Sequence, residues 1–161
     1  MAFFLSQTKY IKDILSEYGF TRCKPLRLPM DTHVKLTHNH GVPMSIPEQH
    51  QRLIGKLIYL TITRSDISFT VHTLSQFTNT PTSVHFHAAK RVIRYLSGSI
   101  SQGILLPSHS AARLTTNFDG DWAGCPITRK STIGFYVLLG DSPISWKAKK
   151  QAVVVSGVSR I

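Results

Sequence analysis

Apolar side chains in the first hundred residues recur at intervals of three and four, which is the spacing of amphipathic helices. The pattern predicts a short strand at residues 2–5, followed by four helices. Small polar residues precede each apolar run, and a glycine or a Thr-Pro pair follows three of the runs. The predicted starts are Ser6, the capping box of Ser45 and Glu48, Ser65-Asp66, and Thr82 or Ser83, and the predicted ends are Gly19, Thr80-Pro81 and Gly98.

Residues 21–47 lack this period and are rich in proline, which predicts an extended connection able to act as a hinge. After Gly103 the period changes to two, which predicts strands at 104–106, 113–119, 133–139 and 143–150. The last three strands would form an antiparallel meander, one face of which no later helix covers. We therefore expect an α+β fold, with a helical unit at 1–100 and an incomplete three-stranded sheet within 101–161.

The composition narrows the class of protein. The chain has 161 residues, 42% of them hydrophobic, so it can build one ordinary domain or a small domain and part of another. A net charge of +11 favours a polyanionic partner, and nucleic acid is the first candidate. Cys23 and Cys125 form no C-x-x-C pair and give no disulfide framework, which favours a reducing compartment.

No apolar run reaches the length of a membrane span, and the apolar start of the chain is too short for a secretion signal. Lys9 and Lys12 give only weak support to an organellar address. We expect an intracellular protein of the cytoplasm or nucleus, with no membrane partner and no small-molecule substrate.

Candidate chemistry begins at Asp119, which lies near the end of a predicted strand. Asp121 would share the face of Asp119 if the strand continued, although capping of the following turn is the simpler interpretation. Asp141 lies in a Gly-Asp-Ser-Pro sequence that is typical of a turn. The pairs His38-x-His40 and His85-x-His87 lack further ligands at zinc spacing, so loop and helix-start positions explain them better.

Basic side chains supply the candidate contacts to phosphate. Few acids lie near them in the sequence, so nucleic-acid contact is a better interpretation than an ordinary solvated face. The candidates are Lys90, Arg91 and Arg94 on the fourth helix, Arg129 and Lys130 in the loop after the aspartates, and Lys147 and Lys149 on one face of the last strand.

Seven blocks of sequence occur in the order found in one known family. They begin at residues 5, 53, 64, 74, 88, 119 and 144 and read Leu-Ser-Gln-Thr-Lys-Tyr, Leu-Ile-Gly-Lys-Leu-Ile-Tyr-Leu-Thr, Arg-Ser-Asp-Ile-Ser-Phe, Leu-Ser-Gln-Phe, Ala-Ala-Lys-Arg-Val-Ile-Arg-Tyr-Leu, Asp-Gly-Asp-Trp-Ala-Gly and Ile-Ser-Trp-Lys. Through these blocks the chain closely resembles the polyprotein of copia-type retrotransposons, from the reverse transcriptase thumb and connection into the start of the ribonuclease H domain.

The resemblance implies a thumb- and connection-like unit at 1–100 and the first part of a ribonuclease H-like domain at 101–161. The family's polymerase centre is a pair of adjacent aspartates, and the sequence contains no Asp-Asp pair. Cleavage of RNA in a hybrid requires about four carboxylates around two Mg²⁺ ions, and Asp119 corresponds to the first of them. The family's next carboxylate lies in a segment from which residues 156–161 depart. Asp119 is therefore expected to be a vestigial catalytic and metal-binding position, and the isolated chain is expected to bind no cofactor.

Three functions remain open at this point. The preferred one is an inactive remnant of a reverse transcriptase and ribonuclease H, with residual binding of RNA–DNA hybrid or duplex. The second is a nucleic-acid-binding module retained by a host. The third is a ribonuclease H that becomes active only when another chain supplies the missing helix and acids.

Overall fold

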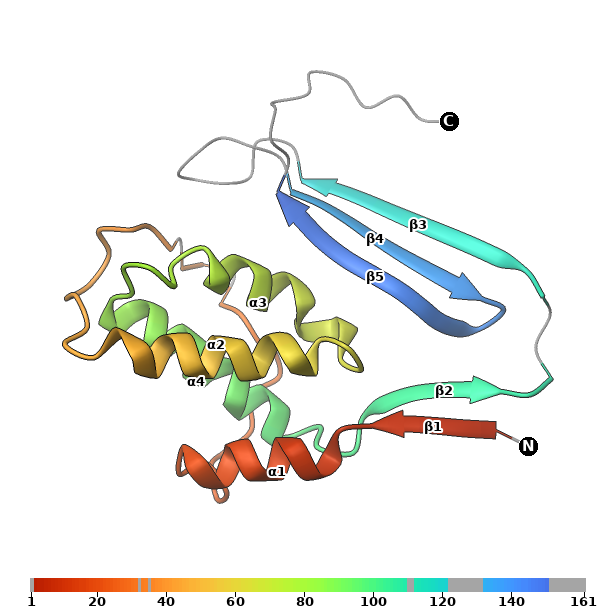
Figure 1. The fold of residues 1–161 in the computed structure, drawn as a ribbon, viewed down its shortest axis with the longest axis horizontal. Helices are drawn as coiled ribbons and strands as arrows, with labels where there is room; N and C mark the ends of the chain where they lie inside the picture. Colours follow the sequence, from red (N-terminus) through yellow and green to blue (C-terminus); the bar gives the residue numbers. More distant parts are fainter. Residues whose placement is uncertain (1, 32, 35, 110–111, 122–131, 151–161) are drawn as a thin grey trace. The chain divides into compact units, whose positions relative to one another are not determined.

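The computed structural model describes residues 2–31, 33–34, 36–109, 112–121 and 132–150. In these ranges the chain is α+β, with four α-helices, one short 3-10 helix and two small antiparallel sheets (Figure 1). It divides into two compact units, a helical unit at 1–109 and a sheet unit at 110–161. The predicted α+β class is confirmed, and so is the presence of four helices in the first hundred residues.

The helical unit is held together by one apolar core. Its elements are β1 (Ala2–Ser6), α1 (Thr8–Glu17), α2 (Pro47–Leu60), the 3-10 helix η1 (Ser65–Ile67), α3 (Ser68–Ser75), α4 (Ser83–Ser97) and β2 (Gly103–Pro107). Each helix buries apolar residues at the spacing that its periodicity predicts, and Ile11, Leu57, Val71 and Ile93 are among the side chains in the resulting core. Ile58 and Ile62, which the pattern also places on the apolar face of the second helix, are exposed. Full burial of such a side chain stabilises the fold by about 1.5–3 kcal/mol.

The helix starts differ from those predicted at two of the four positions. The predicted caps Ser6 and Ser45 are wrong, because α1 starts after Gln7 and α2 after Ile46, without a side-chain cap in either case. Pro47 occupies the first turn of α2, where its fixed backbone angle suits the helix and no N–H donor is needed. Thr82 does precede α4, and its backbone N–H donates to Nδ1 of His85 at 3.0 Å.

The third predicted helix is shorter than expected. It is divided into η1 and α3 and ends at Ser75 instead of Thr80. The hydroxyl of Ser75 donates to the His72 carbonyl at 2.7 Å, and that of Thr78 donates to the Ser75 carbonyl at 2.9 Å. These hydroxyl groups bond backbone carbonyls locally, which competes with continuation of the helix.

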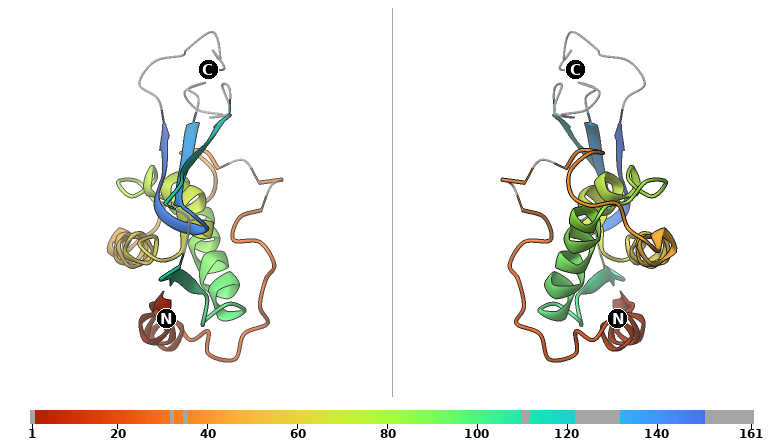
Figure 2. Two further views of the ribbon diagram at one scale, coloured as in Figure 1. Left: turned by 90° about the vertical axis from the view of Figure 1, so that its right-hand side faces the viewer. Right: turned by 90° about the vertical axis from the view of Figure 1, so that its left-hand side faces the viewer.

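The segment between α1 and α2 is irregular, as predicted, and parts of it pack against the helical unit. Leu36 is buried in the core. The Val42 carbonyl accepts the Ser83 N–H at 2.8 Å, and the Pro81 carbonyl accepts the Met44 N–H at 3.0 Å. The segment runs alongside α4 (Figure 2), and backbone hydrogen bonds join it to α4 near both ends of that helix.

Pairing of β1 with β2 joins residues about a hundred positions apart. The strands are antiparallel, and their register runs from Ala2 opposite Pro107 to Ser6 opposite Gly103. A side chain at Gly103 would collide with the Leu5 carbonyl, so the close approach of the strands requires glycine here. Each strand was expected from its pattern, but their partnership was not.

The sheet unit is an antiparallel meander of β3 (Leu114–Asp121), β4 (Thr132–Leu139) and β5 (Ser142–Lys150), as predicted. Gly140 has a φ of 58° in the turn between β4 and β5, which also contains Asp141. The turn interpretation of Asp141 is therefore confirmed. Apolar side chains of this unit are mostly half-buried or exposed, and Phe118 is 75% exposed.

Candidate nucleic-acid interface

The three predicted cations of α4 lie close together but are only partly exposed. Lys90 Nζ lies 4.4 Å from the centre of the Phe86 ring, a cation–π contact. Arg91 Nη1 lies 3.7 Å from Asp31 Oδ2. Nε and Nη2 of Arg94 donate to the Lys24 carbonyl at 3.3 and 3.2 Å. Arg91 and Arg94 therefore bind the segment before α2 as well as presenting charge.

Three further cations lie in the segment bonded to α4 and were not among the predicted site residues. Arg22, Lys24 and Arg27 are exposed in the irregular segment, which is tied to α4 where the Leu26 N–H donates to the Arg94 carbonyl at 3.2 Å. The three residues cluster within six positions of the sequence, but the proline-rich pattern there predicts only a connection. It does not indicate that the segment contacts α4. We call the set of Arg22, Lys24, Arg27, Lys90, Arg91 and Arg94 the α4 basic face.

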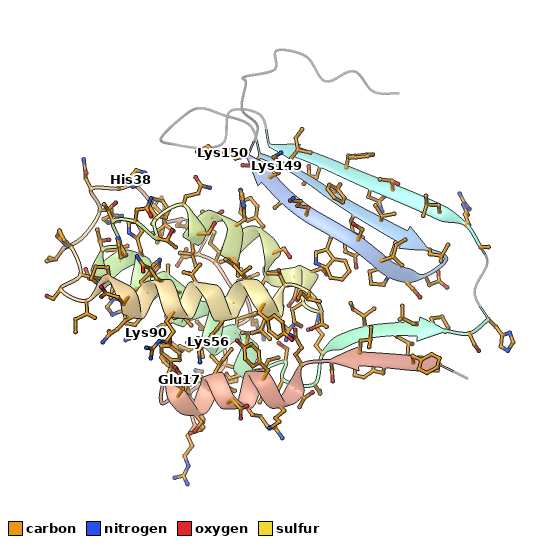
Figure 3. The ribbon with its side chains drawn as sticks, viewed as in Figure 1. Glu17, His38, Lys56, Lys90, Lys149 and Lys150 are labelled. Atoms are coloured by element: carbon orange, nitrogen blue, oxygen red, sulfur yellow. The ribbon has the colours of Figure 1, made fainter. Side chains whose placement is uncertain are left out.

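The predicted lysines of β5 lie on one face of the sheet unit. Lys147 pairs with Phe135 and Lys149 pairs with Ile133, and both lysines are exposed. Figure 3 labels Lys149 and Lys150 at the end of β5. Alternation along the strand places Lys150 on the other face from Lys149.

Asp119 belongs to the opposite face from Lys147 and Lys149. It pairs with Gly134, which in turn pairs with Ala148, so its row across the sheet offers no second ligand. The strand does continue through Asp121, which pairs with Thr132. A duplex lying on one face of this sheet would contact either Asp119 or the two lysines, and not both.

The described residues do not fit a two-Mg²⁺ centre. Asp119 is exposed, and among the residues that the structure describes there is no group of three His, Cys, Asp or Glu able to hold a metal. Arg129 and Lys130 lie outside the described residues, as do 151–161. In the described part of the chain, moreover, every helix is too short or too polar to cross a bilayer.

Two histidines are buried structural groups. His85 accepts the Thr82 N–H through Nδ1, and its Nε2 lies 3.1 Å from the Thr37 carbonyl, which requires the proton on Nε2. Burial lowers the pKa of His85. His50 is fully buried beside Phe86, with neither ring nitrogen in hydrogen-bond geometry. Burial and the nearby His85 lower the pKa of His50 to about 4.

The sequence blocks shared with the family contact one another inside the helical unit. Arg64, 1% exposed, donates to both Asp66 oxygens from Nε and Nη2 at 2.9 and 2.7 Å. Its Nη1 donates to the Ser99 carbonyl at 2.8 Å, and the Tyr95 hydroxyl donates to Asp66 at 2.7 Å. Burial raises the pKa of Asp66, but the hydrogen bonds from Arg64 and Tyr95 outweigh it and hold that pKa below its ordinary value.

A second internal contact joins the first block to the end of α2. The Thr63 hydroxyl donates to Gln7 Oε1 at 2.7 Å, and Gln7 Nε2 donates to the Tyr59 carbonyl at 3.4 Å. Glu17 on α1 and Lys56 on α2 form an ion pair between the same two helices (Figure 3). Much of the shared sequence therefore specifies the fold.

These features define a class: a basic α+β protein with a helical unit, an antiparallel sheet unit and motif residues that lock the helices together. The chain is 42% identical over 151 residues to the retrovirus-related Pol polyprotein from transposon RE2 of Arabidopsis thaliana, covering 94% of this chain and 10% of that polyprotein. It is 31% identical over 158 residues to the corresponding polyprotein from transposon TNT 1-94 of Nicotiana tabacum, covering 93% of this chain and 12% of the polyprotein.

An uncharacterized mitochondrial protein of Arabidopsis thaliana is 41% identical over 154 residues, covering 94% of this chain and 62% of that protein. No family model matches the chain, and no solved structure matches it significantly. Over nearly its whole length the chain is homologous to one segment of the retrovirus-related Pol polyproteins of copia-type retrotransposons. It spans about a tenth of the length of the polyproteins from RE2 and TNT 1-94.

Proposed function

We propose that this chain is a nucleic-acid-binding segment of a retrotransposon Pol polyprotein, without catalytic activity by itself. The helical unit would serve as a thumb- and connection-like element, and the sheet unit would be the first part of a ribonuclease H-like domain. The partner would be an RNA–DNA hybrid or a duplex. The observation that carries the proposal is the α4 basic face, because it gathers six cations from two segments of the helical unit.

The charges of this face suit recognition of a phosphate backbone. Asp31, 3.7 Å from Arg91, is the single acidic residue within the 20–36 segment and α4, so the face keeps a positive excess. Contacts to phosphate release counterions from a duplex and carry no sequence information by themselves. The expected binding is therefore independent of sequence and weakened by salt.

Fluorescence anisotropy with a labelled RNA–DNA hybrid at several salt concentrations tests the proposal. We expect log K to fall linearly with log salt, with a slope of roughly −0.9 for each phosphate contacted. The double variant Lys24→Gln/Arg27→Gln should reduce the size of that slope by about two contacts, because both side chains are exposed and neither is in the core. The change of the same slope in the double variant Lys147→Gln/Lys149→Gln tests whether the sheet unit also contacts phosphate.

A matched control removes the same charge elsewhere. Lys9 and Lys12 are exposed on α1 and belong to neither candidate surface, so Lys9→Gln/Lys12→Gln should leave the slope nearly unchanged. An equal loss in the control and in both test pairs would show a diffuse charge effect and contradict a defined interface. The absence of saturable hybrid binding at low salt would refute the proposed function.

The inactivity has its own test. With Mg²⁺ and an RNA–DNA hybrid, we expect the isolated chain to leave the RNA intact, because Asp119 has no second ligand in its row of the sheet. Cleavage that is lost in Asp119→Asn would overturn this part of the proposal. Cleavage that persists in that variant would identify a contaminating nuclease.

A further inference from the structure

A cavity of about 510 Å³ lies in the helical unit between the 20–36 segment, α3 and α4. Its apolar wall includes Phe20, Leu26, Met30, Leu36, Leu74 and Ala88. Cavities of this size accommodate small organic molecules, which usually lie against apolar walls and are oriented by a few polar groups. The wall therefore offers room for an apolar body.

Three cationic side chains are among the polar groups of the cavity. Lys90, Arg91 and Arg94 line it, and Asp31 is the one acid among the lining residues that the structure describes. Arg91 and Arg94 are three positions apart on α4, so they share one face of the helix. An anion placed in the cavity would thus be favoured over a neutral or cationic molecule of the same shape.

Arg91 has hydrogen-bonding capacity that the protein does not use. Its Nε is buried and has no hydrogen-bond partner. Its Nη1 lies 3.7 Å from Asp31 Oδ2, which is an ionic contact beyond hydrogen-bond length. A buried donor without a partner is uncommon and costs stability. The Arg91 side chain as a whole is 32% exposed, and the two Nη groups of an arginine form a planar fork that binds the two oxygens of a carboxylate.

We propose that this cavity binds an organic anion with one carboxylate and an apolar body, with Arg91 holding the carboxylate. The body lies against the wall formed by the 20–36 segment, α3 and α4. This ligand site goes beyond the proposed nucleic-acid binding and does not depend on it. Because Arg91 also belongs to the α4 basic face, bound ligand would neutralise part of that face.

Isothermal titration of the full chain with decanoate, below its micelle concentration and without nucleic acid, tests the proposal. We expect saturable binding of one equivalent, with decanol at least about tenfold weaker and acetate without measurable binding. Arg91→Gln should weaken decanoate binding about tenfold or more. Arg91→Lys keeps the charge but lacks the fork, so it should restore only part of the affinity.

Two further variants separate a local effect from a general one. Ala88→Leu places extra atoms on the cavity wall and leaves Arg91 intact, so it should weaken decanoate even if the Arg91 variants fold poorly. Arg52→Gln removes an exposed charge outside the cavity and should bind decanoate like the parent chain.

Equal binding of decanol and decanoate, or unchanged binding in both Arg91→Gln and Ala88→Leu, would overturn the proposal. So would the same loss of affinity in Arg52→Gln. Decanoate binding without hybrid binding would refute the proposed function alone, and the reverse result would refute the ligand site alone.

Discussion

At the scale of single residues, the buried imidazoles connect the stability of the helical unit to pH. His50 has a pKa of about 4 in the folded chain, against an ordinary value of 6.5. The unfolded chain therefore binds more protons between these values, and the free energy of unfolding falls as the pH drops through this range. The loss from His50 alone should approach roughly 3 kcal/mol at pH 4. His85 shifts in the same direction.

Urea denaturation at pH 7.5, 5.5 and 4.5 measures this effect. The variant His50→Leu should flatten the pH dependence and should cost little at pH 7.5, since the imidazole nitrogens it removes have no partners. A decline of the same size in the variant and the parent chain would show that other groups cause it.

The Arg64 network should be among the most sensitive polar positions. Arg64→Ala would leave Asp66 without its main partner and the Ser99 carbonyl without its donor, which should lower the free energy of unfolding by about 3–5 kcal/mol. Arg64→Lys should recover only part of that loss, because lysine lacks the planar fork. Chemical denaturation provides the measurement.

The exposed Arg52 on α2 is the natural comparison for Arg64. Arg52→Ala should change the free energy of unfolding by no more than about 0.5 kcal/mol. Similar losses at the two positions would contradict the structural role assigned to Arg64. The sequence block containing Arg64 indicated the family, but only the structure shows that this side chain is buried and bonds Asp66 and the Ser99 carbonyl.

At the scale of elements, local sequence patterns predicted most helices and strands, but they did not predict that β1 pairs with β2. The stripe through Leu53 and Leu57 is a property of consecutive residues, so α2 could be predicted. Its start could not, because Pro47 suits the first turn as well as Ser45 suits a cap. The pairing of β1 with β2 depends on backbone groups a hundred residues apart, and no local pattern encodes it.

Two glycine-to-alanine substitutions compare a position set by a distant strand, Gly103, with one set by its own helix, Gly55. Gly103→Ala should open the β1–β2 pairing, because the added carbon collides with the Leu5 carbonyl. Amide hydrogen exchange in the two strands should then accelerate, with a measurable loss of thermal stability.

The same substitution at Gly55 should have the opposite sign. A side chain there meets nothing, the residue lies inside α2, and alanine should stabilise the chain by about 0.5–1 kcal/mol. Unchanged exchange in β1 and β2 of Gly103→Ala would show that the strands tolerate a side chain at this position.

At the scale of the whole molecule, the core is unevenly distributed along the chain. Every buried hydrophobic side chain among the described residues lies between Ile11 and Ile104, within the helical unit. Among the described residues of the sheet unit, Ser142 is the buried one. We expect native-state hydrogen exchange to show high protection in α2 and α4 and much lower protection in β3, β4 and β5. Equal protection in the two units would contradict this prediction.

The candidate surface shows the same limit of sequence reasoning. Lys90, Arg91 and Arg94 could be grouped because helical spacing places them together. Lys24 could not be added to them, since its carbonyl meets Arg94 through a contact seventy residues apart in the chain. Charge composition indicates a class of partner, whereas the surface that meets the partner depends on tertiary contacts.

The register that places Ala2 opposite Pro107 also brings the two ends of the helical unit together. Such a unit can be inserted between other domains with little disturbance, because the chain enters and leaves it at neighbouring points. The same geometry permits circular permutation: a short linker could join these ends while new termini open in the exposed turn at Gly41. A modular polyprotein could thus exchange or lose this unit as one piece.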